Sequence, residues 1–309
     1  MTADSSLDAF DALDRRFGRA LASLRGLSVG DALGSQFFVP VNYPLLKRRE
    51  LPPEPWQWTD DTEMACSVLA VLAEHGRVDQ DALARSFAER QDFDRGYGPA
   101  VNRMLRLIRE GGDWRELAAA LFNGQGSWGN GAAMRIAPLG AWYASDPEQA
   151  THQAEISSYT THQHREAVVG CMAVAAAAAL AAGPGGPPKP EELLDGVIAL
   201  VPRSAVGAGL RRARDMLDYG DPGTVAAVLG CGRRTSAHDT VPFAIWSAAR
   251  ALGDFEKAFW TTAQAGGDVD TTCAIVGGVV AAAEGGAPPA AWVERTEELP
   301  WWLPSGPAR

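Results

Sequence analysis

Apolar residues recur at helical spacing along nearly the whole chain, and this periodicity limits the folds that the sequence can adopt. Stripes of this kind are formed by Phe17, Leu21, Leu24 and Leu27, by Met64, Val68, Leu69, Val71 and Leu72, and by Val101, Leu105 and Ile108. No segment of five or more residues alternates convincingly between apolar and polar, as a half-buried strand would. The pattern therefore predicts an all-α protein with many short helices.

Segments rich in proline and glycine separate the helical stretches. They lie at residues 51–55, 183–190, 221–223 and 285–289. We expect residues 183–190 to be an exposed loop and not a linker between domains, because two acidic motifs on opposite sides of it have to meet in one core. The sequence thus predicts a single compact domain over residues 1–309, with residues 1–12 and 303–309 frayed.

The charge and composition of the chain exclude several classes of partner. The formal net charge of −10 and the isoelectric point of about 5.0 argue against a surface for nucleic acid or for an anionic membrane. The first 18 residues are polar where a secretion signal would be apolar, and the Ala- and Gly-rich run 167–183 indicates a buried helix. Four scattered cysteines without a Cys-x-x-Cys pair suit a reducing compartment. We expect a cytoplasmic monomer.

The stretch WQWTDDTEMACS, residues 56–67, places two aspartates between two threonines where an apolar helical pattern begins. Thr59 and Asp60 belong to the residue types favoured at helix N-termini, because their oxygens accept the unpaired N–H groups of the first turn. Glu63, three residues after Asp60, gives a variant of the capping box. Helix capping explains this stretch when it is taken alone; the alternative is that Thr59, Asp60 and Asp61 hold a cation.

A second helix start, roughly 200 residues later, repeats this chemistry. In AGGDVDTTCAIVGGVVAA, residues 265–282, Asp268, Asp270 and Thr271 precede another run of small apolar residues. Four carboxylates exceed what two helix caps require, and they would repel one another if the two starts met without cations between them. Oxygen ligands without Cys or His suit Mg²⁺, Mn²⁺ or Ca²⁺ and not zinc. The two motifs together predict a divalent-metal site.

Two further segments have the composition of ligand-binding loops. In NGQGSWGNGAAMRIAPLG, residues 123–140, three glycines free the backbone to present N–H groups to an anion; an ordinary loop is the alternative. The segment lacks the terminal Lys-Ser/Thr of a P-loop. In TTHQHREAVVG, residues 160–170, we expect His162 to contact a substrate phosphate at a helix start, with a satisfied core histidine as the alternative for His164. Zinc is disfavoured there because no third ligand stands at a suitable spacing.

Two shorter motifs complete the set. In GLSVGDALGSQFF, residues 26–38, the glycines allow a neighbouring backbone to approach closely. Asp31 in this motif is a candidate for supporting the metal ligands from behind. DFDRGYGPAVNRML, residues 92–105, is a glycine-hinged helix start that contains Tyr97 and Gly98 and indicates little by itself.

The motifs GDALG, W-TDDT, RGYG, GNGAAMR, THxH and GGDxDT, in this order between residues 30 and 272, resemble the ADP-ribosylglycohydrolase family. The resemblance covers most of the chain, and the pair TDDT and GGDxDT is specific. It implies an all-helical fold with two divalent cations, Mg²⁺ or Mn²⁺, in a central cleft. It also implies hydrolysis of the bond between C1″ of ADP-ribose and an acceptor, so that ADP-ribose and an ADP-ribosylated substrate are the expected partners.

The resemblance assigns roles to single positions of this chain. The metal ligands that it implies are Thr59, Asp60, Asp61, Asp268, Asp270 and Thr271. The residues that it implies for the pyrophosphate and the adjoining ribose are Ser127, Gly129, Asn130 and Gly131, and those for the remaining cleft are His162, Tyr97 and Gly98. The candidates for catalysis are Asp60, Asp61 and Asp270. Either Asp61 or Asp270 would deprotonate the attacking water, and the sequence leaves this choice open.

Phe38 is a departure from the family pattern, because many relatives have a glutamate seven residues after the Asp of GDALG. An aromatic ring cannot ligate Mg²⁺ or take a proton, so relatives that use this glutamate as a metal-site gate are a poor guide. We expect Phe38 to pack against the substrate or close the cleft, with a buried core position as the alternative. At position 272, often Asn in relatives, Thr272 keeps a polar side chain.

Two other functions stay open at this point. The chain could be a non-catalytic ADP-ribose-binding protein that has lost turnover, or a two-metal phosphohydrolase that acts on the pyrophosphate. The usual all-α phosphohydrolases rely on His-Asp pairs in the metal site, and the pair His238-Asp239 stands apart from the acidic motifs. The acceptor, whether arginine, serine, a nucleic-acid base or a small molecule, is not predicted.

Overall fold

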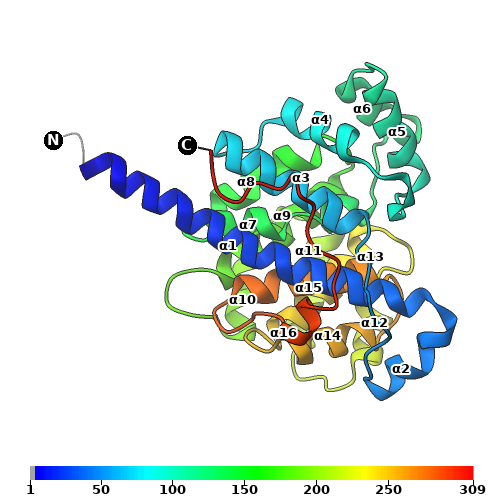
Figure 1. Ribbon diagram of the computed structural model, residues 1–309. Coiled ribbons are helices and arrows are strands. Elements are labelled where there is room, and N and C mark those ends of the chain that lie inside the picture. The colour runs from blue at the N-terminus through cyan, green and yellow to red at the C-terminus, as the bar shows by residue number, and fades with distance from the viewer. Residues whose placement is uncertain (1–3, 309) are drawn as a thin grey trace.

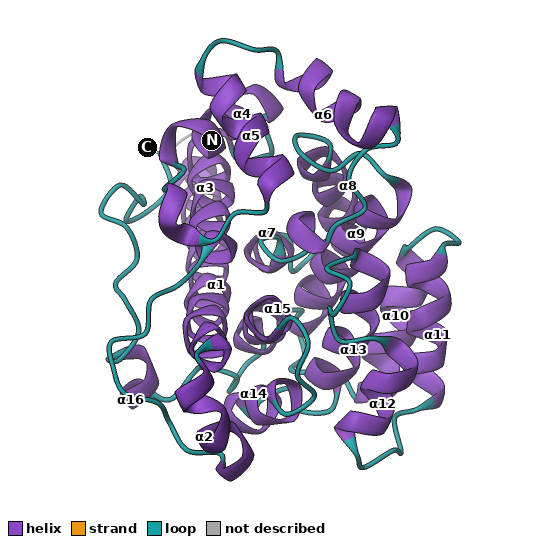
Figure 2. Cartoon of the chain, turned by 90° about the vertical axis from the view of Figure 1, so that its right-hand side faces the viewer, coloured by secondary structure: helices purple, strands orange, loops and turns teal. Residues whose placement is uncertain are grey.

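Helices make up all the regular secondary structure in residues 4–308, the part of the chain that the computed structural model describes (Figure 2). In this part, extended pairing is limited to two isolated bridges, Trp56 with Thr296 and Gly129 with Ser236. The all-α prediction is confirmed.

The α-helices are α1 Asp4–Ser35, α2 Tyr43–Arg48, α3 Asp60–His75, α4 Gln80–Arg90, α5 Pro99–Arg109, α6 Trp114–Gly124, α7 Ala137–Trp142, α8 Pro147–Ser158, α9 Arg165–Ala181, α10 Pro190–Leu200, α11 Ala205–Asp215, α12 Pro222–Leu229, α13 Ala237–Ala249, α14 Phe255–Ala263, α15 Val269–Ala282 and α16 Ala290–Val293. Four short 3-10 turns join them: η1 Gln36–Phe38, η2 Pro40–Asn42, η3 Phe93–Arg95 and η4 Asn130–Ala132.

Helix α15 forms the centre of the core. It contacts α1, α7, α9, α13 and α14, and nearly all of its residues are buried (Figure 2). The Ala-rich run predicted as a buried helix is α9, which packs on α7, α8, α10 and α13. These contacts join the helices into one compact domain, with residues 183–189 as the loop between α9 and α10.

The two ends of the chain differ in structure. Residues 1–3 and 309, which belong to the segments predicted to fray, lie outside the described residues. Residues 4–12 are the first turns of α1, whereas residues 303–308 form a loop. The N–H of Ala308 in that loop donates a hydrogen bond to the carbonyl oxygen of Ala73 (2.9 Å). Whether these segments fray in solution stays a prediction.

Helices α1 and α15 lie side by side with their backbones in direct contact (Figure 1). Gly26, Gly30 and Gly34 of α1 are four residues apart and therefore share one face of the helix. A Cβ at Gly30 would collide with the carbonyl oxygen of Cys273, and a Cβ at Gly34 would lie 2.8 Å from the Cα of Asp270. The close approach expected of the GDALG glycines is thus present, and it places the end of α1 beside the second acidic motif.

All four cysteines are free thiols and are buried, as expected of small core residues. In residues 4–308 no helix is both long and apolar enough to cross a bilayer. The compartment and the oligomeric state stay predictions.

The contact between α1 and α15 predicts opposite effects for two glycine substitutions in the same helix. Gly30→Ala should lower the free energy of unfolding by about 1–3 kcal/mol, because the added methyl group overpacks the contact. Gly18→Ala should raise it by up to about 1 kcal/mol, because Ala is the better helix former and a Cβ there meets nothing within 4 Å. Urea denaturation followed by circular dichroism measures both values. Equal values would show that the two backbones are not in tight contact.

Candidate active site

Helix α3 begins with an N-cap that leaves its first two carboxylates free. The N-cap residue is Thr59, whose hydroxyl oxygen accepts a hydrogen bond from the N–H of Asp61 (3.4 Å). Asp31 of α1 accepts hydrogen bonds from the N–H groups of Thr59 (2.9 Å) and Thr62 (3.2 Å) and from their hydroxyls (2.7 and 2.6 Å). Capping therefore accounts for Thr59 and does not use the side chains of Asp60 or Asp61.

Asp31 orients Thr59 from behind, as the sequence predicts. It is fully buried, and burial raises the pKa of its carboxyl while the four hydrogen bonds lower it. The hydroxyl of Thr59 donates its proton to Asp31 and accepts the N–H of Asp61, so one lone pair of the hydroxyl oxygen remains available to a cation.

The second acidic motif opens α15. Oδ2 of Asp268 accepts a hydrogen bond from Nδ2 of Asn130 (2.7 Å), and Oδ1 of Asp270 accepts one from the N–H of Thr271 (2.7 Å). Thr272 is buried, and its hydroxyl donates to the carbonyl oxygen of Asp268 (2.8 Å). Position 272 therefore supports the backbone of the motif.

The two helix starts meet. Burial and, after it, the charge of Asp31 raise the pKa of Asp60 to about 8, and Asp268 contributes to this shift. Burial, followed by the neighbouring carboxylates, raises the pKa values of Asp61 and Asp270 well above their ordinary value. Carboxylates influence one another in this way only when they lie close together in a site of low polarity. Residues far apart in the sequence thus form one acidic centre.

The donor set of the acidic centre fits a hard divalent cation. Oδ2 of Asp61 is buried, and no group in residues 4–308 forms a hydrogen bond with it. An unpaired buried carboxylate oxygen is costly, and a cation is the partner that would remove both this cost and the repulsion. In residues 4–308 no three Asp, Glu, His or Cys side chains already surround one point at ligand spacing. The centre is a set of facing carboxylates and not a closed coordination shell.

The glycine-rich loop borders the second acidic motif. The side-chain amide of Asn130 donates to Oδ2 of Asp268 (2.7 Å) and to the hydroxyl of Thr240 (3.1 Å). The hydroxyl oxygen of Ser127 accepts a hydrogen bond from the N–H of Gly129 (3.3 Å). Sequence analysis did not foresee that the Asn130 side chain is occupied by Asp268. The backbone N–H of Asn130 also has a partner, the carbonyl oxygen of Thr235 (3.0 Å), so Asn130 supports the loop and has no free N–H for a pyrophosphate.

The surroundings of His162 and His164 differ from those that the sequence predicts. His162, which precedes α9, is only 3 % exposed, and its ring lies so close to Gly131 that a Cβ there would be 2.8 Å from its Cε1. His164 is the N-cap of α9, and its Nδ1 accepts a hydrogen bond from the N–H of Glu166 (3.2 Å). Its half-buried ring stands edge-on to Trp128, with 5.8 Å between the ring centroids. The core position considered for His164 is wrong, because its ring is used at the helix start.

Arg135, a buried arginine that the sequence analysis missed, is linked to His162 through Thr161. Arg135, the last residue of GNGAAMR, donates from Nη2 to Oγ1 of Thr161 (2.8 Å), and this Oγ1 is 2.7 Å from Nδ1 of His162. Arginine only donates, so the hydroxyl hydrogen of Thr161 is free to point at Nδ1, and we assign the imidazole proton to Nε2 on this basis. The signal in the sequence is an arginine inside a run of small apolar residues.

His162 is neutral at pH 7. Burial and, after it, the charge of Arg135 lower the pKa of His162 to about 3. The ring therefore offers an N–H donor beside Gly131 and not a positive charge. Its predicted contact with a substrate phosphate stays a prediction, and it would be a neutral hydrogen bond.

Tyr97 and Gly98, which the resemblance assigns to the remainder of the ADP-ribose cleft, differ in burial. Tyr97 is 6 % exposed, and its hydroxyl donates to Oε2 of Glu63 (2.6 Å), so the phenol ring is part of the core. Gly98 is exposed at the start of α5. A Cβ at Gly96 would lie 3.9 Å from Oδ1 of Asp60. The backbone of this loop, and not the side chain of Tyr97, faces the acidic centre.

Phe38 is 47 % exposed, so the alternative of a buried core position is wrong. Its neighbour Phe37, 3 % exposed, is the core residue and packs on Phe259 and Trp260. Phe38 lines a cavity of about 650 Å³ together with Gly267, the residue directly before Asp268. An aromatic ring beside the acidic centre is consistent with the predicted packing against substrate, which stays a prediction.

These positions predict that two adjacent phenylalanines differ in their effect on stability. Phe37→Ala should cost about 3–5 kcal/mol through lost burial and a cavity, whereas Phe38→Ala should change the free energy of unfolding by no more than about 0.5 kcal/mol. Urea denaturation of both variants measures this difference. A large decrease in the free energy of unfolding for Phe38→Ala would show that this ring is part of the core.

The lowered pKa of His162 predicts a loss of stability in acid. The folded protein holds the ring neutral, whereas the unfolded chain binds a proton below about pH 6.5. The contribution is therefore complete above that pH and is lost as the pH falls toward 3, at up to about 1.4 kcal/mol per pH unit. We expect His162→Gln to reduce the slope of stability against pH between 6 and 4. His152→Gln, which removes an exposed imidazole from α8, is the control, and equal slopes in both variants would contradict the assignment.

Comparisons with known proteins agree with this architecture. The family model described as ADP-ribosylglycohydrolase matches residues 12–305. The chain is 26 % identical to the ADP-ribosylhydrolase ARH3 of Homo sapiens over 87 % of this chain and 86 % of that protein. It is 27 % identical to the ADP-ribosylarginine hydrolase Tri1 of Pseudomonas putida over 91 % and 75 % of the two chains. A solved structure described as an ADP-ribosylglycohydrolase-related protein complex matches with a TM-score of 0.66 and 28 % identity, covering 92 % of this chain and 94 % of that one. The chain belongs to the ADP-ribosylglycohydrolase family.

Proposed function

We propose that the protein is a metal-dependent ADP-ribosyl hydrolase that cleaves the bond between C1″ of ADP-ribose and an acceptor and releases free ADP-ribose. The observation that carries this proposal is the acidic centre between α3 and α15, joined to the glycine-rich loop by the Asn130–Asp268 hydrogen bond. An ADP-ribosyl group has vicinal ribose hydroxyls and a pyrophosphate. A site for this group needs an oxygen-rich cation site next to an anion-binding loop. In this protein the acidic centre and the glycine-rich loop lie next to each other.

Two divalent cations, Mg²⁺ or Mn²⁺, would be held by residues from both helix starts. These are Thr59, Asp60, Asp61, Asp268, Asp270 and Thr271. When bound, the cations supply Lewis acidity that fixes the 2″- and 3″-hydroxyls and polarises water. Asp31 and Asn130 keep the thermodynamic cost of ordering these ligands low, because each already holds one of them by hydrogen bonds.

The loop from Ser127 to Gly131 would receive the pyrophosphate through the backbone N–H groups of Ser127, Trp128 and Gly131, because those of Gly129 and Asn130 donate to Ser127 and Thr235. The Nε2–H of His162 would be an additional neutral donor. Trp128 is 54 % exposed on the same loop. Its ring and that of His164 offer an aromatic surface on which an adenine ring can stack. The backbone around Gly96 and Gly98 would line the cleft near Asp60.

Cleavage would proceed through positive charge at C1″, as in other glycoside hydrolyses. The carboxylates of the acidic centre stabilise this charge. The oxygen of a water molecule forms the new bond to C1″ as the bond to the acceptor breaks, and Asp61 or Asp270 takes the proton from the water.

Phe38 would pack against the acceptor side of the substrate, because it lies beside the Gly266-Gly267 turn that precedes Asp268. ARH3 and Tri1 are both named as ADP-ribosylhydrolases, and only the name of Tri1 specifies arginine. The acceptor of this protein therefore has to be found by experiment.

A panel of substrates ADP-ribosylated on arginine, on serine, on a nucleic-acid base and on a small molecule tests the function. We expect free ADP-ribose from at least one of them in the presence of Mg²⁺ or Mn²⁺. Saturable ADP-ribose binding without any product would identify a binding protein, and AMP with ribose phosphate would identify a phosphohydrolase. Either result would overturn the proposal.

The acidic centre predicts that Asp60→Asn and Asp268→Asn lose activity by about 10²-fold or more. The helical circular dichroism should stay unchanged, because neither side chain forms the cap hydrogen bond of its helix. Chelation should lower the melting temperature of the unmodified protein, since a ligand bound at 100 times its Kd contributes about 2.7 kcal/mol. The two variants should respond less to chelation, because each has lost a ligand. Full activity of the chelated protein would contradict the metal centre.

A further inference from the structure

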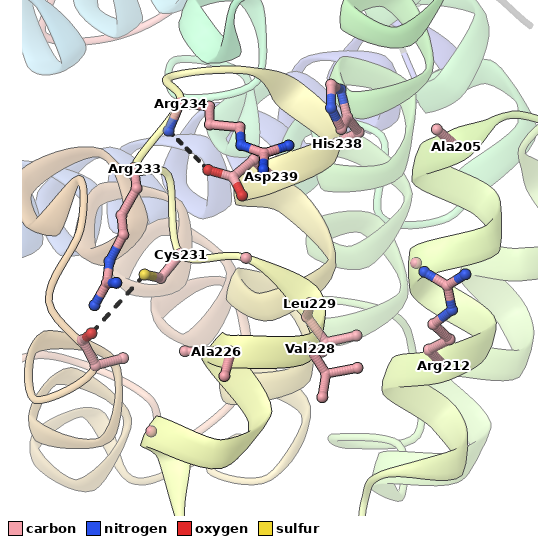
Figure 3. Close-up of a pocket in the computed structure, with 15 residues that line it drawn as sticks. Ala205, Arg212, Ala226, Val228, Leu229, Cys231, Arg233, Arg234, His238 and Asp239 are labelled. Carbon is pink, nitrogen blue, oxygen red and sulfur yellow. Dashed lines mark hydrogen bonds between the residues drawn. The ribbon is translucent and has the colours of Figure 1, made fainter.

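Residues 230–236 join α12 to α13, and several of them line a cavity of about 490 Å³ that also borders α11 (Figure 3). The backbone of this segment is unusual, because Gly230, Gly232 and Thr235 have positive φ values of 90°, 84° and 50°. A positive φ is uncommon for a β-branched residue such as Thr235, and it persists only where the surroundings determine it. The segment is therefore held in one conformation by its neighbours.

Asp239, in the first turn of α13, contacts this segment at three positions. Its carbonyl oxygen accepts a hydrogen bond from the N–H of Gly232 (2.8 Å), and its Oδ2 accepts one from the backbone N–H of Arg234 (2.8 Å; Figure 3). A Cβ at Gly230 would collide with the carbonyl oxygen and with Oδ1 of Asp239. Asp239, which is not among the proposed metal ligands, thus determines the path of the segment.

The segment in turn holds the start of α15. The carbonyl oxygen of Cys231 accepts a hydrogen bond from the N–H of Asp268 (3.0 Å). A Cβ at Gly232 would collide with Cβ of Asp268, and a Cβ at Gly267 would collide with the carbonyl oxygen of Cys231. Because the two backbones are in direct contact, the position of Asp268 follows that of Cys231 and Gly232.

The other end of the segment pairs with the glycine-rich loop. Gly129 and Ser236 form an isolated antiparallel bridge, and the carbonyl oxygen of Thr235 accepts a hydrogen bond from the N–H of Asn130 (3.0 Å). Residues 230–236 therefore contact both parts of the site proposed for the ADP-ribosyl group, the acidic centre at Asp268 and the loop for the pyrophosphate.

We propose that Asp239 is a positioning residue, which acts through residues 230–236 on the backbones of Asp268 and Asn130. This proposal rests on the proposed function, in which Asp268 is a metal ligand and Asn130 belongs to the loop for the pyrophosphate. When the hydrogen bond from Arg234 to Asp239 is lost, the segment gains other conformations, and the carbonyl oxygens that hold the two amides move with it. Asp239 therefore contributes to metal binding, although it is not itself a proposed ligand.

Asp239 also carries a negative charge near Asp268. Burial raises the pKa of Asp268, and the charge of Asp239 adds to this effect. Two conservative substitutions separate the charge from the position. Asp239→Asn removes the charge and keeps an oxygen that can accept the N–H of Arg234, whereas Asp239→Glu keeps the charge and displaces the carboxyl group by one methylene group.

Hydrogen exchange of the metal-free, full-length protein measures the position, because the amide of Asp268 exchanges when its hydrogen bond to Cys231 opens. We expect Asp239→Glu to speed exchange at the amides of Asp268 and Asn130 by about tenfold, which corresponds to the loss of a hydrogen bond to a charged group. Asp239→Asn should leave both rates within about threefold of those in the unmodified protein, because the hydrogen bond is kept.

The matched control is Asp221→Ala. It removes the N-cap carboxyl group of α12, which accepts hydrogen bonds from the N–H and the hydroxyl of Thr224 (2.7 and 2.6 Å), and it should leave both exchange rates unchanged. Isothermal titration with Mn²⁺ adds a readout on the proposed metal site. Asp239→Glu should bind Mn²⁺ about tenfold more weakly or worse, and Asp239→Asn within about threefold of the unmodified protein.

The outcomes are distinguishable. Faster exchange at both amides and weaker Mn²⁺ binding in Asp239→Glu, with neither change in Asp239→Asn, support the proposal. Exchange rates in Asp239→Glu that equal those of the unmodified protein overturn it. Exchange in Asp239→Asn that is as fast as in Asp239→Glu also overturns it, because the hydrogen-bond acceptor is then not what holds the segment. Failure of the proposed function has a different result: no substrate releases ADP-ribose, whereas the exchange rates still decide the role of Asp239.

Discussion

The direct backbone contact between α1 and α15 is the constraint on which the site depends. With Gly26, Gly30 and Gly34 facing α15, no side chain separates the two helices. The contact runs to the start of α15, where Gly34 meets Asp270, and it passes Asp31 one turn earlier. Because the helices cannot slide without steric overlap, the carboxyl group that holds α3 and the carboxyl groups of α15 have fixed relative positions.

Around this contact, some polar side chains form several hydrogen bonds and fix the position of neighbouring residues, whereas others have unpaired oxygen atoms. Asp31 accepts four hydrogen bonds from the start of α3, and Asn130 links the glycine-rich loop to Asp268. Within residues 4–308, Oδ2 of Asp61 is buried and has no such partner. Proteins keep buried, mutually repelling charges mainly where a ligand or reaction uses them. The uneven distribution of hydrogen bonds therefore agrees with the proposed division between supporting residues and metal ligands.

The helices and the two acidic motifs could be predicted from the sequence because their signals are local. Helical periodicity, glycines four residues apart and acidic residues at helix starts are each visible within about 15 residues. The features that the sequence does not reveal depend on contacts with residues distant in the chain. The side chain of Asn130 is committed to a residue 138 positions away, and the ring of His162 is buried by a glycine loop and by Arg135. Neighbouring positions such as Phe37 and Phe38 can be told apart only when the packing partners of each are known.

An acidic protein that acts on an anionic pyrophosphate has to overcome electrostatic repulsion at its own site. In the proposed function, the donors that this chain of net charge −10 offers to the pyrophosphate at the glycine-rich loop are backbone N–H groups and the neutral His162. Arg135 is buried, and its hydrogen bond to Thr161 links it to His162. The attraction for the pyrophosphate then has to come from cations at the acidic centre, so substrate binding and metal binding are coupled by charge.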